Sequence, residues 1–126
     1  MDELFDASAL ERVIKEYDTI DEGRHEFLEI EDWGVMHLII KNPLGLHARP
    51  STEVCKITLR YQGGIYIIKK GSAEKASDAK SISSLLLLAA DFDSNLYFFY
   101  DLSDPEKARK NAHELKALFE GNFGIP

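Results

Sequence analysis

A histidine, an arginine and a proline stand close together near the middle of the chain, in the segment Gly45-Leu46-His47-Ala48-Arg49-Pro50. Proline is common in the first turn of a helix, so Pro50 places His47 at a helix N-terminus. Unpaired N–H groups and the positive end of the helix dipole favour a phosphate at such a position. Arg49 can add charge-assisted hydrogen bonds to phosphate oxygens, and an imidazole can act as a covalent nucleophile. The segment therefore predicts phosphoryl chemistry at His47.

A histidine near a helix start also has simpler interpretations. Taken alone, His47 fits a surface or capping residue better than a nucleophile. Gly45, His47, Arg49 and Pro50 together, between a strand and a helix, have no equally good structural explanation. A small hydrolase that uses His47 as a general base is a third alternative, but the sequence places no serine, cysteine or carboxylate partner for it.

Residues 45–52, GLHARPST, resemble the active-site signature of HPr, the histidine phosphocarrier of the phosphoenolpyruvate-dependent sugar phosphotransferase system. The similarity continues through Lys80-Ser81-Ile82, which resembles the start of the family's second helix, and through a last helix that opens at Asp104. It covers residues 35–120. The resemblance implies an α+β fold, an open-faced β-sandwich in which a four-stranded antiparallel sheet carries three helices on one face.

The resemblance also implies roles for individual residues. His47 would be the phosphorylated nucleophile, Arg49 would orient the phosphate, and Ala48 would contribute a backbone amide. The phosphoryl donor would be Enzyme I, itself charged by phosphoenolpyruvate, and the acceptors would be the IIA domains of sugar permeases. No metal and no bound cofactor is implied for the carrier.

The second helix of the family carries regulatory and docking positions. Ser81 would be the regulatory serine, with a serine kinase as a further partner, although a serine before an apolar run is already explained as a helix N-cap. Ile82, Leu86 and Lys56 are expected in the surface that docks partner proteins. Ser83-Ser84 stand where the family usually has an exposed apolar residue followed by a small or basic one, which weakens that surface.

A basic stripe on the helix after His47 leaves two interpretations open. Arg49, Lys56 and Arg60 lie at i, i+7 and i+11, so an acidic partner could contact them, or they could simply be solvated. A second function also fits the resemblance, a regulatory HPr-like module that senses the state of the phosphotransferase system without relaying phosphate. His47 favours the carrier, whereas the long N-terminal extension favours the regulatory module.

The composition is that of a globular protein with one compact domain. The chain has 126 residues, of which 44% are hydrophobic and 29% charged, and this length sustains one core. Cys55 is the only cysteine, which excludes an intrachain disulfide and favours a reducing compartment. The longest apolar run, 85–90, is too short to cross a bilayer, and the N-terminus lacks the features of a signal peptide. We therefore expect a cytoplasmic protein without membrane insertion.

The net charge of −7 is divided unevenly along the chain. Residues 1–34 contain twelve acidic and three basic residues, a balance of −9, whereas residues 35–126 contain ten acidic and twelve basic residues, a balance of +2. An acidic chain argues against general nucleic-acid binding. We interpret residues 1–34 as an acidic extension of a carrier domain at 35–126. The extension could fold back over Arg49, Lys56 and Arg60, or it could add a helix and a strand elsewhere in the fold.

Hydrophobic periodicity predicts the order of helices and strands. In the extension, a capping box at Ser8 precedes a helix through Tyr17, followed by a loop over 18–24 and a short strand over 27–30 that turns at Asp32-Trp33-Gly34. From residue 35 onward the predicted order is β-α-β-β-α-β-α, with strands over 35–40, 65–69, 74–77 and 96–100 and helices over 48–61, 82–89 and from Asp104. The inner stripe of the last helix is predicted to contain Ala108, Ala112, Leu115 and Phe119.

Overall fold

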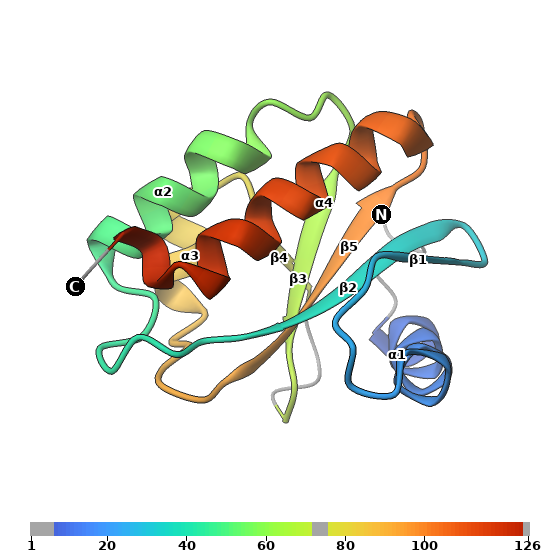
Figure 1. The fold of residues 1–126 in the computed structure, drawn as a ribbon, viewed down its shortest axis with the longest axis horizontal. Helices are drawn as coiled ribbons and strands as arrows, with labels where there is room; N and C mark the ends of the chain where they lie inside the picture. The colour runs from blue at the N-terminus through green and yellow to red at the C-terminus, as the bar shows by residue number, and fades with distance from the viewer. Residues whose placement is uncertain (1–6, 72–75, 125–126) are drawn as a thin grey trace.

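A computed structural model describes residues 7–71 and 76–124 of the chain. Its elements are α1 (Ala7–Asp21), β1 (Leu28–Ile30), β2 (Trp33–Ile39), α2 (Ala48–Thr58), β3 (Ile65–Lys69), β4 (Ser77–Asp78), α3 (Ile82–Leu87), β5 (Asn95–Asp101), α4 (Pro105–Glu120) and a 3-10 turn at Asn122–Gly124. The predicted order β-α-β-β-α-β-α is confirmed from β2 to α4 (Figure 1). The strand predicted over 74–77 lies partly outside the described residues, and its described counterpart is β4.

The strands form one antiparallel sheet in the order β1-β2-β5-β3-β4. Four of them, β2 to β5, are the strands that the resemblance implies, and the extension adds β1 as a fifth strand at the edge, where Leu28 pairs with Val35. The turn predicted at Asp32-Trp33-Gly34 is wrong, because the chain already turns at residues 31–32. Trp33 begins β2 and is paired on both sides, with Ile30 and with Asp101.

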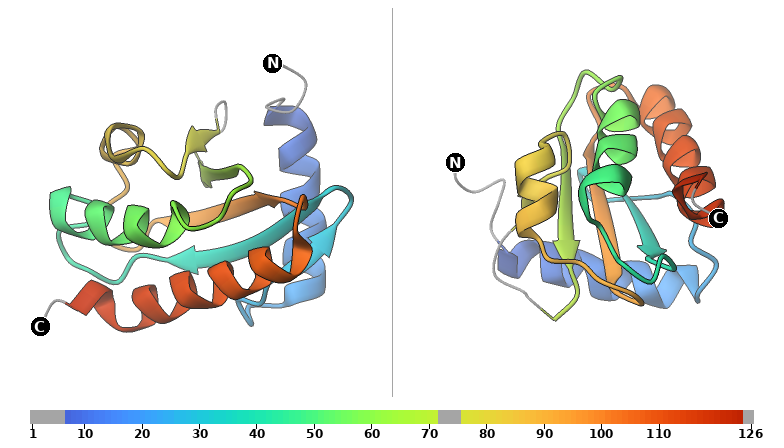
Figure 2. Two further views of the ribbon diagram at one scale, coloured as in Figure 1. Left: turned by 90° about the horizontal axis from the view of Figure 1, so that it is seen from above. Right: turned by 90° about the vertical axis from the view of Figure 1, so that its left-hand side faces the viewer.

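Helices α2, α3 and α4 lie together on one side of the sheet, as the open-faced sandwich predicts (Figure 2). The predicted inner stripe of α4 is confirmed, since Ala108, Ala112, Leu115 and Phe119 are all buried. Two of these helices are shorter than their patterns predict. α2 ends at Thr58 and α3 at Leu87, because the following residues adopt turns, with Ala89 in the left-handed region at φ 54°.

Helix α1 packs on the opposite face of the sheet, which the open-faced sandwich by itself leaves uncovered (Figure 2). The buried residues of this second core are Leu10, Val13, Ile14, Tyr17, Ile30, Val35, Ile68, Tyr97 and Phe99. A helix with one apolar stripe must bury that stripe against another element, and the sheet supplies the apolar partner surface. The extension is therefore part of the packed fold.

Polar side chains of α1 join the helix to the sheet. The Tyr17 hydroxyl donates to the carbonyl oxygen of Glu26 at 2.6 Å and accepts from the His37 N–H at 3.1 Å. The Tyr97 hydroxyl donates to the Asp18 carboxylate at 2.8 Å. Burial is the main reason that the pKa of each of these two tyrosines is raised, so both stay protonated and able to donate.

Helix α1 is longer than the predicted helix. The helix includes Ala7 and Ser8, so its predicted start at a Ser8 cap is wrong, and it runs to Asp21 where a loop from Asp18 was predicted. The Asp21 carboxylate accepts from the backbone N–H groups of His25 and Glu26 at 2.7 and 2.8 Å, which stabilises the turn that leads to β1. Among the described residues, no helix is long and apolar enough to span a bilayer.

Candidate functional site

His47 is the N-cap residue of α2, at the end of the loop that leaves β2. Two backbone hydrogen bonds hold this position: the Leu46 N–H donates to the Ala90 carbonyl oxygen at 2.8 Å, and the Ser51 N–H donates to the His47 carbonyl oxygen at 3.0 Å. Gly45 has φ 74°, and a Cβ atom there would lie 2.4 Å from the Ala90 oxygen. Only glycine fits this close approach, so the loop is anchored against the segment that follows α3.

The first turn of α2 offers backbone donors to an anion. Ala48 and Arg49 are its first two residues, whose N–H groups no carbonyl of the helix can reach. Pro50 has no N–H, and the next donor, Ser51, already bonds to the His47 carbonyl. The helix start therefore presents the two amides of Ala48 and Arg49 next to the imidazole.

The His47 ring is half-buried, and its Nε2 atom lies 3.4 Å from the side-chain nitrogen of Asn42. Asn42 is itself buried, although its only sequence signal was that an Asn-Pro pair ends a strand. That signal did not identify it as a neighbour of the histidine. An asparagine shortly before a glycine turn can bond to backbone groups a few residues on, which is the pattern that could have revealed it.

Arg49 is exposed, and within residues 7–71 and 76–124 no carboxylate forms an ion pair with it. The other two cations of the basic stripe are engaged: Lys56 pairs with Glu53 at 3.1 Å and Arg60 with Glu114 at 2.5 Å. These carboxylates belong to α2 and α4. The alternative in which the acidic extension folds back over the stripe is therefore wrong for its described residues, because α1 packs on the other face of the sheet.

Ser81 is the N-cap of α3, and its hydroxyl oxygen accepts from the Ser84 N–H at 3.1 Å. Only Leu85 of this helix is buried. Ile82, Leu86 and Leu87 are 41%, 43% and 84% exposed. Large apolar side chains gathered on the surface are typical of a protein interface, and the exposure of Leu87 is a feature that the sequence patterns did not single out.

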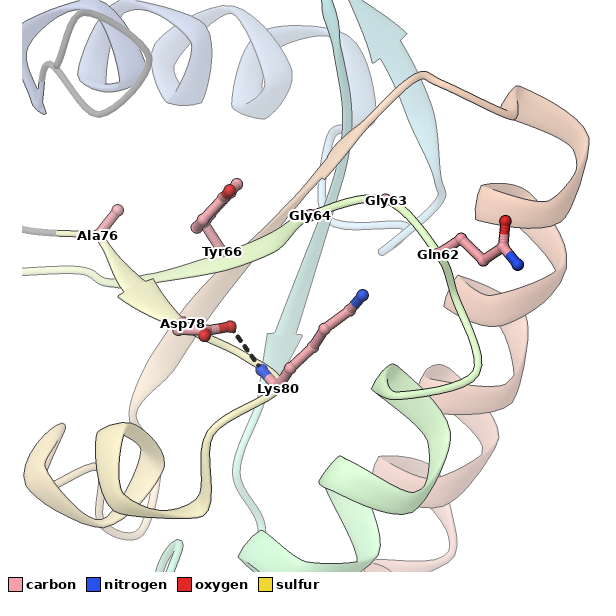
Figure 3. A pocket seen from close by; sticks show the side chains of 7 residues that line it. All are labelled: Gln62, Gly63, Gly64, Tyr66, Ala76, Asp78 and Lys80. Atoms are coloured by element: carbon pink, nitrogen blue, oxygen red, sulfur yellow. Dashed lines mark hydrogen bonds between the residues drawn. The ribbon is translucent and has the colours of Figure 1, made fainter. Parts of the chain in front are cut away.

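Two further features lie apart from His47. A depression of about 550 Å³ is lined by Gln62, Gly63, Gly64, Tyr66, Ala76, Asp78 and Lys80, where the Lys80 N–H donates to Asp78 at 2.9 Å (Figure 3). Neither His47 nor Arg49 lines it. Cys55 is buried, and burial raises the pKa of its thiol, so it is a poor nucleophile.

The comparison with known proteins identifies the family. The family model described as "PTS HPr component phosphorylation site" matches residues 36–120. Phosphocarrier protein HPr of Xylella fastidiosa is 33% identical over 86 residues, which cover 68% of this chain and 90% of that protein.

Solved structures give the same result. The crystal structure of an HPr from Thermoanaerobacter tengcongensis aligns with a TM-score of 0.61 and 27% identity, over 73% of this chain and 97% of that one. The histidine-containing phosphocarrier protein of a Mycoplasma aligns with a TM-score of 0.56 and 25% identity, over 64% of this chain and 88% of that one. The matched region contains the glycine turn, His47 and Arg49. The chain therefore belongs to the HPr family of phosphocarrier proteins of the phosphotransferase system.

Proposed function

We propose that this protein accepts a phosphoryl group on His47 from Enzyme I, which phosphoenolpyruvate has phosphorylated, and passes the group to the IIA domains of sugar permeases. The observation that supports this most directly is the position of His47 at the start of α2, beside the N–H groups of Ala48 and Arg49, which form no backbone hydrogen bond within the described residues. A carrier of this kind works in the cytoplasm, the reducing compartment that a single unpaired cysteine favours.

The proposed transfer needs positioning and charge stabilisation more than a substrate pocket. A ring nitrogen of neutral His47 attacks phosphorus, and the bond between phosphorus and the donor breaks as the new P–N bond forms. The negative charge on the phosphoryl oxygens is stabilised by the two backbone amides and by the guanidinium of Arg49, which no described carboxylate neutralises. Transfer to a IIA domain is the same exchange with the roles of donor and acceptor reversed.

The proposed docking surface combines Ile82 and Leu86 of α3 with Lys56 of α2, since α2 and α3 are in contact. Leu87 extends its apolar part. Ser83 is exposed between these apolar residues, so the surface is less apolar than the one the resemblance implies. A partner with a small apolar patch and nearby carboxylates would match it.

The direct test is to incubate the protein with phosphoenolpyruvate and Enzyme I, measure its intact mass, and then add a IIA domain. We expect an acid-labile phosphoryl adduct that disappears as the IIA domain gains it. An adduct that forms but never moves to a IIA domain would favour the regulatory module instead. Failure to form any adduct with active Enzyme I would contradict both functions.

Arg49→Ala should slow phosphorylation about 10- to 100-fold while leaving the fold intact. A hydrogen bond to a charged group is worth about 1.5–3 kcal/mol. If Arg49 makes that bond in the transition state, its loss raises the activation free energy by this amount, and each increase of about 1.4 kcal/mol slows the reaction about tenfold. Arg49 is exposed, so its removal opens no cavity. Rapid-quench kinetics with Enzyme I measure the effect, and Arg60→Ala, in the turn that follows α2, is the control. Equal rates for the two variants would contradict the role of Arg49.

Ser81→Asp should reduce the rate of transfer from Enzyme I without unfolding the domain. A negative charge at a helix N-terminus is tolerated locally, whereas a charge beside Ile82 opposes docking of an apolar partner surface. We propose on this basis that Ser81 is the site at which a serine kinase would regulate the carrier. The measurement is the rate at limiting Enzyme I, with Ser81→Asn, which keeps a capping side chain without the charge, as the control. An unchanged rate would show that Ser81 acts only as the cap of α3.

A further inference from the structure

Two large apolar side chains are exposed on the loops around His47. Leu44 stands three residues before His47 and is 75% exposed, and Phe92, in the turn that follows α3, is 54% exposed. Single apolar residues scattered over a surface need no explanation. These two stand on segments that meet, because a Cβ atom on Gly45 would lie 2.6 Å from the Cα atom of Asp91. The chain neighbours of Leu44 and Phe92 are therefore in close backbone contact.

Hydrogen bonds hold the segment of Leu44 beside the histidine. The Leu44 N–H donates to Oδ1 of Asn42 at 3.3 Å, and Nδ2 of Asn42 donates to the Gly45 carbonyl oxygen at 3.0 Å. The same Nδ2 atom lies 3.4 Å from Nε2 of His47. Leu44 is therefore displayed by a turn that lies against the imidazole.

The turn that carries Phe92 is tied to the end of β2, from which the His47 loop departs. The Asp93 N–H donates to the Ile40 carbonyl oxygen at 2.8 Å, and the Ile40 N–H donates to the Ser94 carbonyl oxygen at 3.1 Å. Lys41 also forms an ion pair with Asp93 at 3.4 Å. Both turns are thus fixed before any partner binds, which lowers the entropic cost of a contact made through them.

The chemistry of the site determines what covers these residues. The chain belongs to a family of phosphocarriers, and a phosphoryl group reaches a histidine only when the donor's phosphorus comes within bonding distance of the ring. A donor protein in that position must also cover the exposed groups next to the ring. Beside Phe92, Lys41 and Asp93 neutralise one another, so the exposed surface there is an apolar contact with a polar rim.

We propose that Leu44 and Phe92 form a contact surface for the phosphoryl donor, whose matching surface is apolar beside its own phosphorylated residue. The proposal rests on the proposed function of His47. This contact surface differs from the docking surface formed by Ile82, Leu86 and Lys56, because it belongs to the loops at His47 and not to α2 or α3. It would help to hold the donor at the ring itself.

The test measures steady-state phosphorylation by Enzyme I for wild type, Leu44→Ser, Phe92→Ser and the double variant. We expect KM for the carrier to rise about threefold in each single variant and on the order of tenfold in the double variant, because a few buried apolar side chains dominate an interface. The maximal rate should stay within about twofold of wild type, since a contact equally strong in the bound and transition states changes KM alone.

Two controls separate this contact from an effect on the fold. Ile20→Ser also removes an exposed apolar side chain, 47% exposed on α1, which packs on the opposite face of the sheet, so it should leave KM unchanged. Leu44→Met keeps an apolar side chain on the same turn and should retain a KM near that of wild type. Urea denaturation checks that every variant is folded.

Equal KM values for wild type and the double variant would overturn the proposal. A lower maximal rate at unchanged KM would also overturn it, because the residues would then position the His47 loop without contacting the donor. If the wild-type protein accepts no phosphoryl group, the proposed function fails, and calorimetric titration with unphosphorylated Enzyme I still tests the surface. Weaker binding of the double variant than of wild type would support the contact, whereas equal binding or no binding of wild type would contradict it.

Discussion

Replacing His47 with alanine should abolish phosphorylation by Enzyme I completely, while the variant stays folded. The imidazole is the group at the start of α2 that can attack phosphorus, since the hydroxyls of Ser51 and Thr52 both donate to backbone carbonyl oxygens. The backbone amides beside it can stabilise a phosphoryl group but cannot form a bond to it. The side chain is half-buried at the surface, so its loss leaves no large cavity in the core. Intact mass after incubation with phosphoenolpyruvate and Enzyme I measures the result.

His113→Ala is the appropriate control for that experiment. His113 is an exposed histidine on α4 and belongs to neither of the two described cores. We expect the His113→Ala variant to be phosphorylated at the wild-type rate. A phosphoryl adduct of undiminished amount on the His47→Ala protein would show that another residue is the acceptor and would contradict the proposed site.

Tyr17→Ala should lower the free energy of unfolding by about 3–5 kcal/mol, the usual cost of deleting a buried aromatic side chain. Tyr17 is fully buried between α1 and the sheet, packs edge-on against Tyr97, and bonds to both Glu26 and His37. A domain of this size has a total free energy of unfolding of only about 5–15 kcal/mol. Urea denaturation followed by circular dichroism measures the loss.

Tyr17→Phe separates the hydroxyl from the ring. It keeps the packing but leaves the Glu26 carbonyl and the His37 N–H without their partner, so a smaller loss of about 1–3 kcal/mol is expected. The folded fraction of either variant should be phosphorylated at the wild-type rate, because α1 lies on the opposite face of the sheet from α2. Unchanged stability in Tyr17→Ala would show that α1 is not part of the folded core in solution. Faster phosphorylation at low salt would instead indicate that the extension shields the site.

Much of the local structure of the carrier domain was predictable from the chain itself. Ser81 and Asp104 cap α3 and α4, Pro50 and Pro105 stand in first turns, and the stripe of α4 that ends at Phe119 is buried. These features depend on residues within one or two helical turns, where capping and periodicity are physical consequences of the local sequence. The position of His47 at a helix start is of the same kind.

The contacts between distant segments were decided only by the tertiary structure. Nothing local to Trp33 shows that it pairs with Asp101, and nothing local to Arg60 shows that Glu114 neutralises it. The apolar stripe of α1 requires a partner surface, and the alternation of side chains on the paired strands leaves one on the far face of the sheet. The contact between Asn42 and His47 depends in the same way on how the turn packs against Ala90. Strand register and packing are set by the whole chain at once, so a short pattern predicts which residues seek burial but not which neighbours bury them.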